Sequence, residues 1–412
     1  MFRKILQFLL KKQARRVLKK INPIIIGITG SVGKSSTKEM IALGLSGFFK
    51  VRKSFSNYNN EVGVPLTILG EESKGNNIAK WIYVLGKNRI KRINKENYPE
   101  VLVLEMAADH PKDIDYLLSI VRPQVGVLTA IAPCHLKYFG SVEKVKREKI
   151  KLLTGLDTNG WAIFNIDNPY LRDINFSLKS KTLTYGFSER AEVRALEFQL
   201  EYSFKGKTPR ILGLRFKASC SGKVIPIFLP NVISQSLVYS ALAALAVGMT
   251  QNLNLLRIAE RLKKYKPLPG RMNLIYNSKG ILIIDDTYNS SPYAVKNALD
   301  DLDRIKINGQ KYLVLGDMLE LGDKEKEYHL EVGQEIAKRK EYSLIGVGDL
   351  ARFFVQGAEQ AGIKKDNLYF KDKKQALAYL VQNLKQGDIV LVKGSRATKM
   401  EDIVQGLVQS KR

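Results

Sequence analysis

The chain has 412 residues, 45% of them hydrophobic and 26% charged, a composition that excludes a disordered or fibrous protein and fits roughly two or three domains. The net charge of +27 suggests a nucleic-acid or membrane partner, but the surplus is mostly lysine spread along the chain. We interpret it as a lysine-rich solvated surface and do not expect nucleic acid as a partner. Cys134 and Cys220 lack metal spacing and fit small core residues in a reducing cytoplasm.

The first 20 residues, MFRKILQFLLKKQARRVLKK, contain eight basic residues and no acidic residue. Apolar residues recur there at mainly helical spacing: Phe2, Ile5, Leu6, Leu9, Val17, Leu18 and Ile21. A basic amphipathic helix either lies on an anionic bilayer or docks its apolar face on the protein's own core, and the sequence leaves both open. We expect neither a transmembrane helix nor a signal peptide, because ILQFLL is too short and no small-residue cleavage site follows it.

From residue 24 onward, short apolar runs alternate with helical stretches. The runs are IIIGITG, VLVLEMAADH, VGVLTAIAPCHL, AIFNIDN, ILIIDDTYN, YLVLGDM, SLIGVGD and DIVLVKGSR. Continuous apolar strands that alternate with helices indicate parallel sheets covered on both faces, with ligands bound beyond the carboxyl ends of the strands. The predicted fold is α/β, with a central three-layer domain that contains a phosphate-binding loop and a Rossmann-like C-terminal domain.

The pattern changes between roughly residues 180 and 230, where shorter alternating segments indicate antiparallel strands attached to the first sheet. The segment YKPLPGRM, residues 265–272, has two prolines and a glycine and is the best candidate for a domain junction. We therefore predict a basic N-terminal helix at 1–22, a central domain at 23–267 and a C-terminal domain at 268–412.

The stretch GITGSVGKSSTKEM follows an apolar strand and opens a helix. Glycines in such a loop let the backbone approach a phosphate, and the helix N-terminus adds positive potential. Lys34 is expected to reach the β- and γ-phosphates of a nucleotide, and the Ser35 hydroxyl to ligate Mg²⁺. The spacing is the short form TGxxGKS rather than GxxxxGK[ST].

Other polar side chains follow the remaining strands. Glu105 ends one strand and His135 follows another, so both are expected at the same sheet edge as Lys34. Taken alone, Glu105 is equally compatible with a surface residue at a strand end, and a lone histidine is more often structural than a ligand. The placement of His135 at the same edge as Lys34 and Glu105 favours a functional role. Lys149 lies in a lysine-rich helical stretch, and nothing in its own spacing singles it out. IIDDTYNSSP and VKGSRATKMED supply paired carboxylates and a Lys/Arg pair that suit phosphoryl transfer and capture of a carboxylate.

Together these stretches resemble the Mur ligase family, the ATP-dependent amide-forming ligases of peptidoglycan precursor synthesis. The matching segments occur in the family's order: TGSVGKSSTKE, NYNNEVGVPLTIL, LEMAADHPKDI, PCHLKYFGS, FNIDN, PGRM, DDTYNSSP, LGDMLELG and VKGSRATKMED. Within the family they are most similar to the members that join D-alanyl-D-alanine to UDP-N-acetylmuramoyl-tripeptide. Another amide ligase of the superfamily, or a catalytically silent membrane-associated relative, are the alternatives.

The resemblance implies that a substrate carboxylate attacks the γ-phosphate of ATP and that an amine then displaces phosphate from the acyl phosphate. It assigns catalytic roles to Lys34, His135, Lys149 and Arg396. It assigns nucleotide contacts to Gly30, Ser31, Gly33, Lys34, Ser35, Ser36, Asn165, Asp167, Arg271, Asp286, Tyr288 and Asn289. It assigns Mg²⁺ ligands to Ser35, Glu105, His135 and Lys149, the last as a carbamylated lysine. It assigns substrate contacts to Asn59, Asn60, Lys393, Ser395 and Arg396.

The sequence departs from the family pattern at Ala107, Lys151, Ser236 and Ser240, where glycine, glutamate, histidine and asparagine are usual. A larger departure concerns the N-terminal domain that recognises the UDP-sugar in relatives, because about 22 residues of basic helix stand in its place. Either this helix brings the enzyme to a membrane or a partner, or the acceptor differs. We expect a cytoplasmic monomer, with peripheral contact at the inner face of the membrane through residues 1–20.

Overall fold

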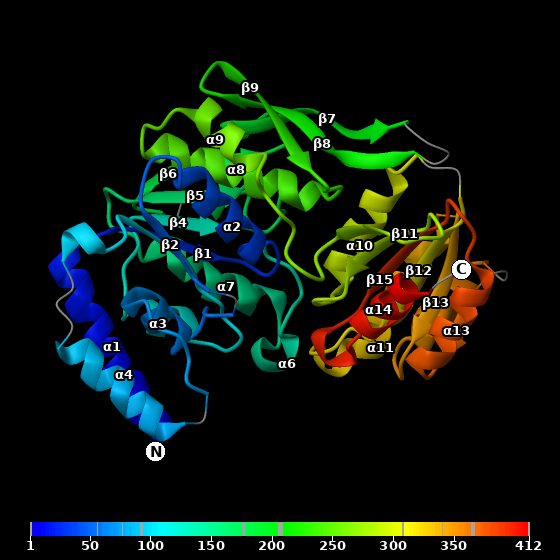
Figure 1. Cartoon of the computed structure of the whole chain (residues 1–412), viewed down its shortest axis with the longest axis horizontal. Helices are drawn as coiled ribbons and strands as arrows, with labels where there is room; N and C mark the ends of the chain where they lie inside the picture. The colour runs from blue at the N-terminus through cyan, green and yellow to red at the C-terminus, as the bar shows by residue number, and fades with distance from the viewer. Residues whose placement is uncertain are drawn as a thin grey trace.

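The computed structural model describes residues 2–55, 57–75, 77–90, 94–174, 178–204, 209–306, 309–339, 341–363 and 367–410. Two α/β bodies lie side by side, each built on one twisted sheet (Figure 1). This arrangement confirms the predicted fold class of two mostly parallel sheets covered by helices.

The first sheet has nine strands in the order β2-β3-β1-β4-β5-β6-β7-β8-β9. Its strands are β1 (Ile24–Thr29), β2 (Val51–Lys53), β3 (Val101–Glu105), β4 (Val125–Leu128), β5 (Trp161–Asn165), β6 (Lys181–Gly186), β7 (Val193–Ser203), β8 (Arg210–Cys220) and β9 (Lys223–Pro230). The strands from β2 to β7 pair in parallel, whereas β7, β8 and β9 pair antiparallel. The predicted antiparallel extension of the first sheet is thus confirmed.

Helices cover both faces of the first sheet. They are α1 (Phe2–Ile21), α2 (Lys34–Leu45), α3 (Gly63–Leu69), α4 (Ile78–Ile90), η1 (Lys95–Asn97), α5 (Asp113–Leu118), α6 (Leu136–Phe139), α7 (Val142–Thr154), α8 (Gln235–Thr250) and α9 (Leu255–Leu262). Alternate residues of the strands face opposite layers, as the period of a strand requires. Ile26 and Ile28 pack under α2 and α8, whereas Ile25 packs on the side of α1 and α3.

The second sheet has six strands in the order β10-β11-β15-β12-β13-β14, and only β10 is antiparallel to its neighbour. Its strands are β10 (Asn273–Tyr276), β11 (Leu282–Asp286), β12 (Lys311–Gly316), β13 (Tyr342–Val347), β14 (Leu368–Phe370) and β15 (Ile389–Lys393). Its helices are α10 (Pro292–Asp303), η3 (Gly322–Lys324), α11 (Glu325–Ala337), α12 (Arg352–Gln360), α13 (Lys373–Asn383), η4 (Arg396–Thr398) and α14 (Glu401–Gln409). Two apolar clusters, one on each face, hold the layers together.

The N-terminal helix α1 buries one side against the protein. Its buried residues are Leu6, Leu10, Ala14, Val17 and Ile21, which join the cluster of α3, α5 and α7. Of the two alternatives left open by the sequence, docking on the protein's own core is therefore observed. The expectation of a single apolar face was wrong in part, because Phe2 and Ile5 are exposed. Within the described residues, no helix is both long and apolar enough to cross a membrane.

Candidate active site

The phosphate-loop residues lie between β1 and α2 at the carboxyl edge of the first sheet. Gly33 caps α2 with φ = 82°, a left-handed conformation that favours glycine. A Cβ on Gly30 would lie 2.0 Å from Oγ1 of Thr129, so only glycine fits there. The Ser31 amide donates to Ala130 O at 2.7 Å, which fixes the loop to the residues after β4. The loop thus presents its amides and the N-terminus of α2 to the adjacent cavity, as an anion requires.

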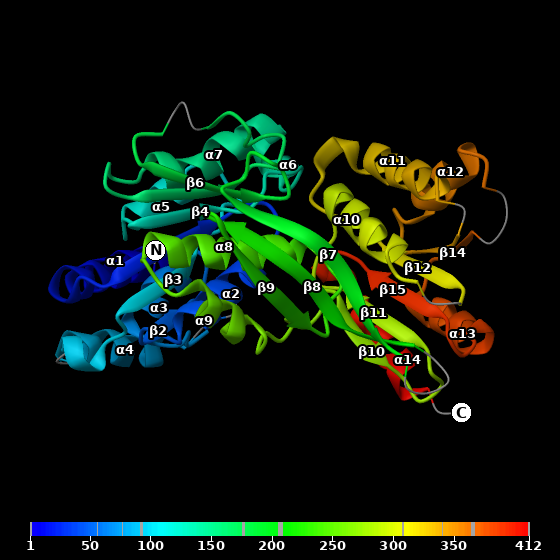
Figure 2. The ribbon, with the colours of Figure 1, turned by 90° about the horizontal axis from the view of Figure 1, so that it is seen from above.

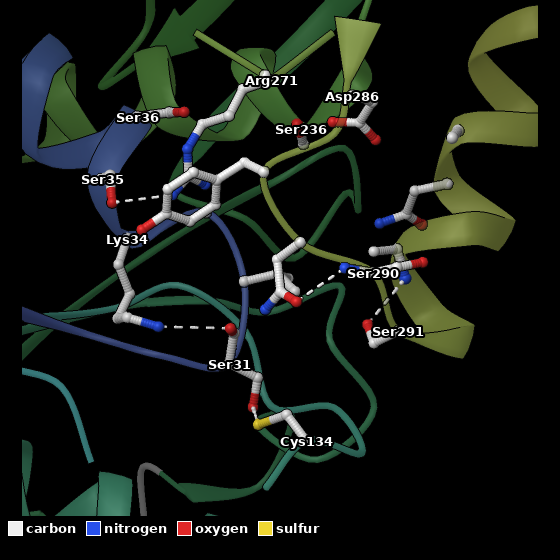
Figure 3. Close-up of a pocket in the computed structure, with 18 of the residues that line it drawn as sticks. Ser31, Lys34, Ser35, Ser36, Cys134, Ser236, Arg271, Asp286, Ser290 and Ser291 are labelled. Carbon is white, nitrogen blue, oxygen red and sulfur yellow. Dashed lines mark hydrogen bonds between the residues drawn. The ribbon is translucent and has the colours of Figure 1, made fainter. Parts of the chain in front are cut away.

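Lys34 and Ser35 begin α2 and both line the cavity (Figure 3). The Lys34 ammonium donates to the carbonyl oxygens of Gly30 and Ser31 at 2.8 and 3.4 Å. The Ser35 hydroxyl accepts a hydrogen bond from the Arg271 guanidinium at 3.3 Å, a contact that joins the two sheets. An incoming phosphate could take the place of these partners, which lie in the loop itself for Lys34 and in the second sheet for Ser35.

Glu105 ends β3, next to β1 in the sheet, and is 2% exposed. Its Oε1 accepts from the Asn59 side chain at 3.1 Å. Its Oε2 has no hydrogen-bond partner, although the Lys38 ammonium lies 3.5 Å away. A buried carboxylate oxygen without a partner is costly unless a cation or a donor occupies the space before it.

His135 follows β4 on the other side of β1 and adopts a left-handed backbone conformation with φ = 52°. Its Nδ1 lies 2.8 Å from Oε2 of Glu320, and its Nε2 lies 3.3 Å from Oδ1 of Asp109. Burial lowers the pKa of His135, and the Asp109 and Glu320 carboxylates oppose that shift. The imidazole is therefore held between two acidic side chains at the edge of the cavity.

Lys149 is 1% exposed on α7, although its sequence context suggests a solvated helix face. Its ammonium donates to Ala108 O at 3.1 Å, close behind Asp109. Burial and, second, the nearby Lys34 ammonium together lower the pKa of Lys149 to about 8. Roughly one tenth of this amine is thus unprotonated at pH 7, and that neutral fraction can act as a nucleophile.

Asn165 and Asp167 lie at the end of β5. Asn165 lines a second cavity of about 150 Å³ beside the phosphate loop, together with Tyr185, Tyr239 and Ser240. The Asp167 carboxylate instead accepts from the amides of residues 187 and 188 at 2.6 and 3.0 Å and from the Tyr239 hydroxyl at 3.0 Å. Asp167 does not line either cavity; it shapes the wall behind the second one.

Arg271, Asp286, Tyr288 and Asn289 approach the phosphate loop from the second sheet. The Arg271 guanidinium lies 4.0 Å from the centroid of the Tyr288 ring, a cation–π arrangement. The Tyr288 hydroxyl donates to Asn57 Oδ1 at 3.2 Å, which forms another contact between the sheets. All four residues line the main cavity, so the structure brings them together with Lys34 and Ser35.

Asp286 and Lys393 are register partners on the neighbouring strands β11 and β15. The Lys393 ammonium is 2% exposed in its side chain and donates to Asp286 Oδ2 at 2.6 Å and to Asn289 O at 2.9 Å. Burial raises the pKa of Asp286, and the Lys393 charge opposes the shift. The buried pair places one cation and one anion at the wall of the cavity.

Three predicted substrate residues lie outside the set that lines the main cavity. Ser395 is buried, and its hydroxyl accepts from the Leu319 amide at 2.9 Å. Arg396 is 68% exposed in its side chain and pairs with Glu401 at 3.3 Å. Asn60 accepts from the amides of Val62 and Gly63 and so caps the start of α3. Their assignment to substrate stays a prediction.

The main cavity has a volume of about 320 Å³ and lies between the two sheets. Its lining includes Ser31, Gly33, Lys34, Ser35, Ser36, Asn59, Glu105, Asp109, Cys134, His135, Arg271, Asp286, Tyr288, Asn289, Glu320 and Lys393.

Two family models match the sequence of this chain. They are the Mur ligase middle domain over residues 28–248 and the Mur ligase, glutamate ligase domain over residues 270–396.

The chain belongs to the Mur ligase family.

It is 31% identical over 401 residues to the UDP-N-acetylmuramoyl-tripeptide–D-alanyl-D-alanine ligase of Bacillus subtilis strain 168, covering 97% of this chain and 79% of that relative. The MurF ligase of Thermotoga maritima in complex with ADP is similar in structure, with a TM-score of 0.79 and 28% identity over 98% of this chain and 83% of its own. A MurF crystal structure from Acinetobacter baumannii has a TM-score of 0.81 and 26% identity, covering 98% and 81% of the two chains. These relatives are ATP-dependent ligases that form a carbon–nitrogen bond, and this Mur ligase is an enzyme of the same class.

The donors at the phosphate loop of this Mur ligase fit a Mg²⁺ ion. Glu105 Oε2 is a buried carboxylate oxygen without a hydrogen-bond partner, and the Ser35 hydroxyl opens on the same cavity. Within the described part of the chain, no three His, Cys, Asp or Glu side chains are grouped to hold a metal by themselves. Magnesium does not need such a group, since it usually keeps several waters and binds one or two carboxylates plus substrate phosphates.

The sequence did not single out four residues of this site, namely Lys38, Asn57, Asp109 and Glu320. Lys38 is buried beside Glu105, and the Asn57 side chain accepts a hydrogen bond from the Tyr288 hydroxyl. Asp109 and Glu320 flank His135. Asp109 and Glu320 lie inside the family-like segments EMAADHP and LGDMLELG, which was an available signal. The expectation that both cysteines are core residues holds for Cys220, but Cys134 is only half-buried and donates to the Ser31 hydroxyl at 3.2 Å.

Proposed function

We propose that this Mur ligase joins D-alanyl-D-alanine to UDP-N-acetylmuramoyl-tripeptide at the expense of ATP. The observation that carries the proposal is the match to the B. subtilis ligase of that name over 97% of the chain, with the phosphate loop, Glu105 and the Asp286–Lys393 pair gathered around one cavity. ATP supplies the energy of the bond, since a carboxylate does not react with an amine unaided.

In the first step a carboxylate oxygen of the peptide attacks the γ-phosphorus of ATP, and the bond to the ADP oxygen breaks. Charge spreads over the phosphoryl oxygens, so catalysis is mainly positioning and electrostatic stabilisation. Lys34 and the amides of the phosphate loop stabilise that charge from one side of the cavity, and Arg271 from the other. In the second step the amine attacks the acyl carbon, phosphate leaves and the amine loses a proton.

The chain's donors divide into a nucleotide side and a metal side. Ser35 and Glu105 would hold Mg²⁺, which neutralises charge between the β- and γ-phosphates when it is bound. His135 lines the same cavity and would serve a second ion through one ring nitrogen, which would exchange its carboxylate contact for the ion. The contact of the other ring nitrogen, with Glu320 or Asp109, would then orient the imidazole. The second cavity, lined by Asn165, Tyr185 and Ser240, is the proposed site of the adenine base.

Lys149 is proposed to carry a carbamate. The neutral amine attacks the carbon of CO₂, a nitrogen–carbon bond forms and the nitrogen loses a proton, which leaves a carboxylate-like group. A pKa lowered to about 8 supplies the neutral amine that this reaction needs. In ¹³C-bicarbonate the protein should give one carbamate carbon signal that is absent in Lys149→Arg; no signal in the wild-type protein would exclude the modification under those conditions.

The deciding experiment for the reaction is ADP release by the purified protein with Mg²⁺, ATP, UDP-N-acetylmuramoyl-tripeptide and D-alanyl-D-alanine, repeated with each omitted in turn. Release that needs both the peptide and the dipeptide supports the proposal. Release that needs another amine, or no release with any combination while ADP still binds, contradicts it. Binding of ADP is measured separately by calorimetry.

The predicted division of the chain at 22/23 and 267/268 is kept as part of this proposal. It agrees with residues 263–272, which form no regular element and connect α9 to β10. A cytoplasmic location is also proposed, because ATP and a nucleotide-linked peptide would be the substrates. The protein is further proposed to be a monomer. Size-exclusion chromatography with light scattering measures the molar mass in solution and so tests whether the protein is a monomer. Peripheral membrane contact through residues 1–20 stays a prediction. Because α1 buries one face on the protein, such contact would have to use its other face.

A further inference from the structure

Helices α1 and α4 lie side by side at the end of the molecule that is remote from the second sheet (Figures 1 and 2). The side chain of Gln13 donates to Leu85 O at 2.8 Å, which ties the two helices together. Each helix packs one stripe of residues against the protein and exposes another stripe to solvent. The outward stripes are not used by the proposed reaction.

The outward stripe of α4 is apolar. The helix buries Trp81 and Val84, whereas Ile78, Ile82 and Tyr83 are 52%, 64% and 67% exposed. Ile78 and Ile82 are four residues apart and lie on one face of α4, and Tyr83 extends the exposed apolar surface on the side away from Trp81 and Val84. A helix that presents apolar residues on the face opposite its buried one has a second surface to cover.

The first turns of α1 add to that surface. Phe2, Ile5 and Phe8 are 42%, 49% and 63% exposed. Six of the fifteen large hydrophobic side chains that are exposed among the described residues thus lie on two neighbouring helices. Single exposed apolar residues are ordinary, but a group of this kind marks an interaction site. We call these six residues, Phe2, Ile5, Phe8, Ile78, Ile82 and Tyr83, the apolar patch.

The surroundings of the apolar patch are strongly basic. Neither α1 nor α4 contains an acidic residue. The nearby Glu61 and Glu71 are already paired with Arg3 and Lys87 at 2.6 and 3.2 Å. Six exposed cations on α1 form no ion pair with any residue that the structure describes: Lys4, Lys12, Arg15, Arg16, Lys19 and Lys20. We call these six residues the basic stripe.

We propose that the apolar patch and the basic stripe dock this protein on an anionic lipid bilayer. Aromatic and aliphatic side chains enter the boundary between headgroups and acyl chains, and the lysines and arginines contact anionic headgroups. Charge complementarity selects this occupant, because two adjacent helices without an acidic residue present both an apolar face and a cationic one. The proposal deepens the membrane contact predicted for residues 1–20, to which it adds the surface of α4, and it does not depend on the proposed reaction.

The docked face is connected to the active site through a short path. Arg3 and Gln7 on α1 both donate to Glu61 Oε1, at 2.6 and 3.0 Å. Glu61 lies two residues after Asn59, whose side chain donates to Glu105 in the cavity. Binding to a bilayer would therefore place the loop that carries Asn59 close to the membrane surface.

The test uses the full chain in co-sedimentation with vesicles of phosphatidylcholine alone and of phosphatidylcholine with phosphatidylglycerol. Deletion of residues 2–20 is a poor probe, because it also removes core residues such as Leu10. Surface changes are sharper. Ile82→Ser combined with Tyr83→Ser should lower the partition coefficient on anionic vesicles at least about tenfold. Arg15→Gln combined with Lys19→Gln should lower it about 30-fold and weaken its salt dependence.

Matched controls change the same residue types at remote sites. Leu256→Ser with Tyr369→Ser alters two exposed apolar residues on α9 and β14, and Lys263→Gln with Lys324→Gln removes two exposed charges. Both controls should bind anionic vesicles as the wild-type protein does. The proposal is overturned by absence of wild-type binding to anionic vesicles at low salt, by equal binding to neutral vesicles, or by unchanged binding of the patch variants. Dimerisation that the patch variants lose, without vesicle binding, would assign the surface to a second copy.

Discussion

Oε2 of Glu320 lies 2.8 Å from Nδ1 of His135, and this pair joins the second sheet to the first at the edge of the cavity. Glu320 follows β12, whereas His135 follows β4, so the contact exists only when the two bodies are together. Asp109 holds the other ring nitrogen at 3.3 Å. The orientation of the imidazole therefore reports on the relative position of the two sheets.

Glu320→Gln should lower kcat roughly 10- to 100-fold, since carboxylates that orient a ligating histidine have effects of that size. The substitution keeps the shape but removes the charge beside the imidazole. The unfolding temperature should not change, because the Glu320 side chain is 53% exposed. Steady-state kinetics and thermal unfolding measure the two effects, and Glu327→Gln, an exposed residue of α11, is the control. Equal kcat in both variants would remove Glu320 from the mechanism.

Lys34→Ala should lower turnover roughly 100- to 1000-fold, as expected for loss of a group that stabilises transition-state charge. The protein should stay folded, because among the residues that the structure describes the ammonium bonds only to carbonyl oxygens of its own loop. ADP release measures turnover, and circular dichroism checks the fold. Full activity of this variant would contradict the assignment of the phosphate loop. Lys263→Ala, on the surface after α9, should be indistinguishable from the wild-type protein.

Lys393→Met should destabilise the fold by about 3 kcal/mol, because it leaves the Asp286 carboxylate without its cation. Adding Asp286→Asn should recover most of that loss by removing the unpaired charge. Urea unfolding of the wild-type protein, both single variants and the double variant completes the cycle. If the two single losses simply add in the double variant, the pair contributes no coupling energy and the explanation fails.

The lowered pKa of Lys149 predicts that the free energy of unfolding depends on pH. Its pKa is lowered from 10.5 to about 8 in the folded protein, so between these values the unfolded chain binds more protons than the native one. The free energy of unfolding should therefore gain a component on the order of 2 kcal/mol as the pH rises from 8 to 10. Lys149→Met should lack this component. Urea unfolding in bicarbonate-free buffer at both pH values decides it, and parallel curves for the two proteins would contradict the lowered pKa.

Gly270 and Gly86 predict opposite effects of the same substitution. Gly270 has φ = 69°, and a Cβ there would lie 2.9 Å from the Tyr288 amide nitrogen, so Gly270→Ala should cost about 1–2 kcal/mol. Gly86 lies within α4, and a Cβ there meets no atom within 4 Å, so Gly86→Ala should add about 0.5–1 kcal/mol. Thermal unfolding compares the two variants. A loss of stability at both positions would show that backbone conformation is not the cause.

Much of the site follows from strand ends that the sequence alone shows. Glu105 is the last residue of β3, Lys34 and His135 follow the ends of β1 and β4 within the next loop, and the sheet places β3 and β4 on either side of β1. Parallel strands bring their carboxyl ends to one edge, so these three residues meet without any information beyond the pattern. Asp286 and Lys393 meet for the same reason on β11 and β15.

Other features are obscured in the local pattern or depend on contacts between distant elements. Lys149 lies four residues after Val145 and three before Leu152, both fully buried, so it shares their face of α7; the lysines around it hide that spacing. The exposure of Phe2 and Ile5 depends on where α3 and α4 pack against α1. Helical periodicity predicts an apolar face but not which part of it a distant helix covers.

The two bodies are held together differently at different places. At the start of β8, Ile211 and the nearby Ile233 pack into the apolar core of the second sheet, and the Ile211 amide donates to the Tyr276 hydroxyl at 2.9 Å. Around the cavity the contacts are polar pairs such as Arg271 with Ser35. Separating apolar surfaces costs free energy in proportion to their area, whereas polar pairs exchange with water at little net cost. Opening should therefore proceed as a rotation about a hinge at β8, which frees the products while the apolar joint stays closed.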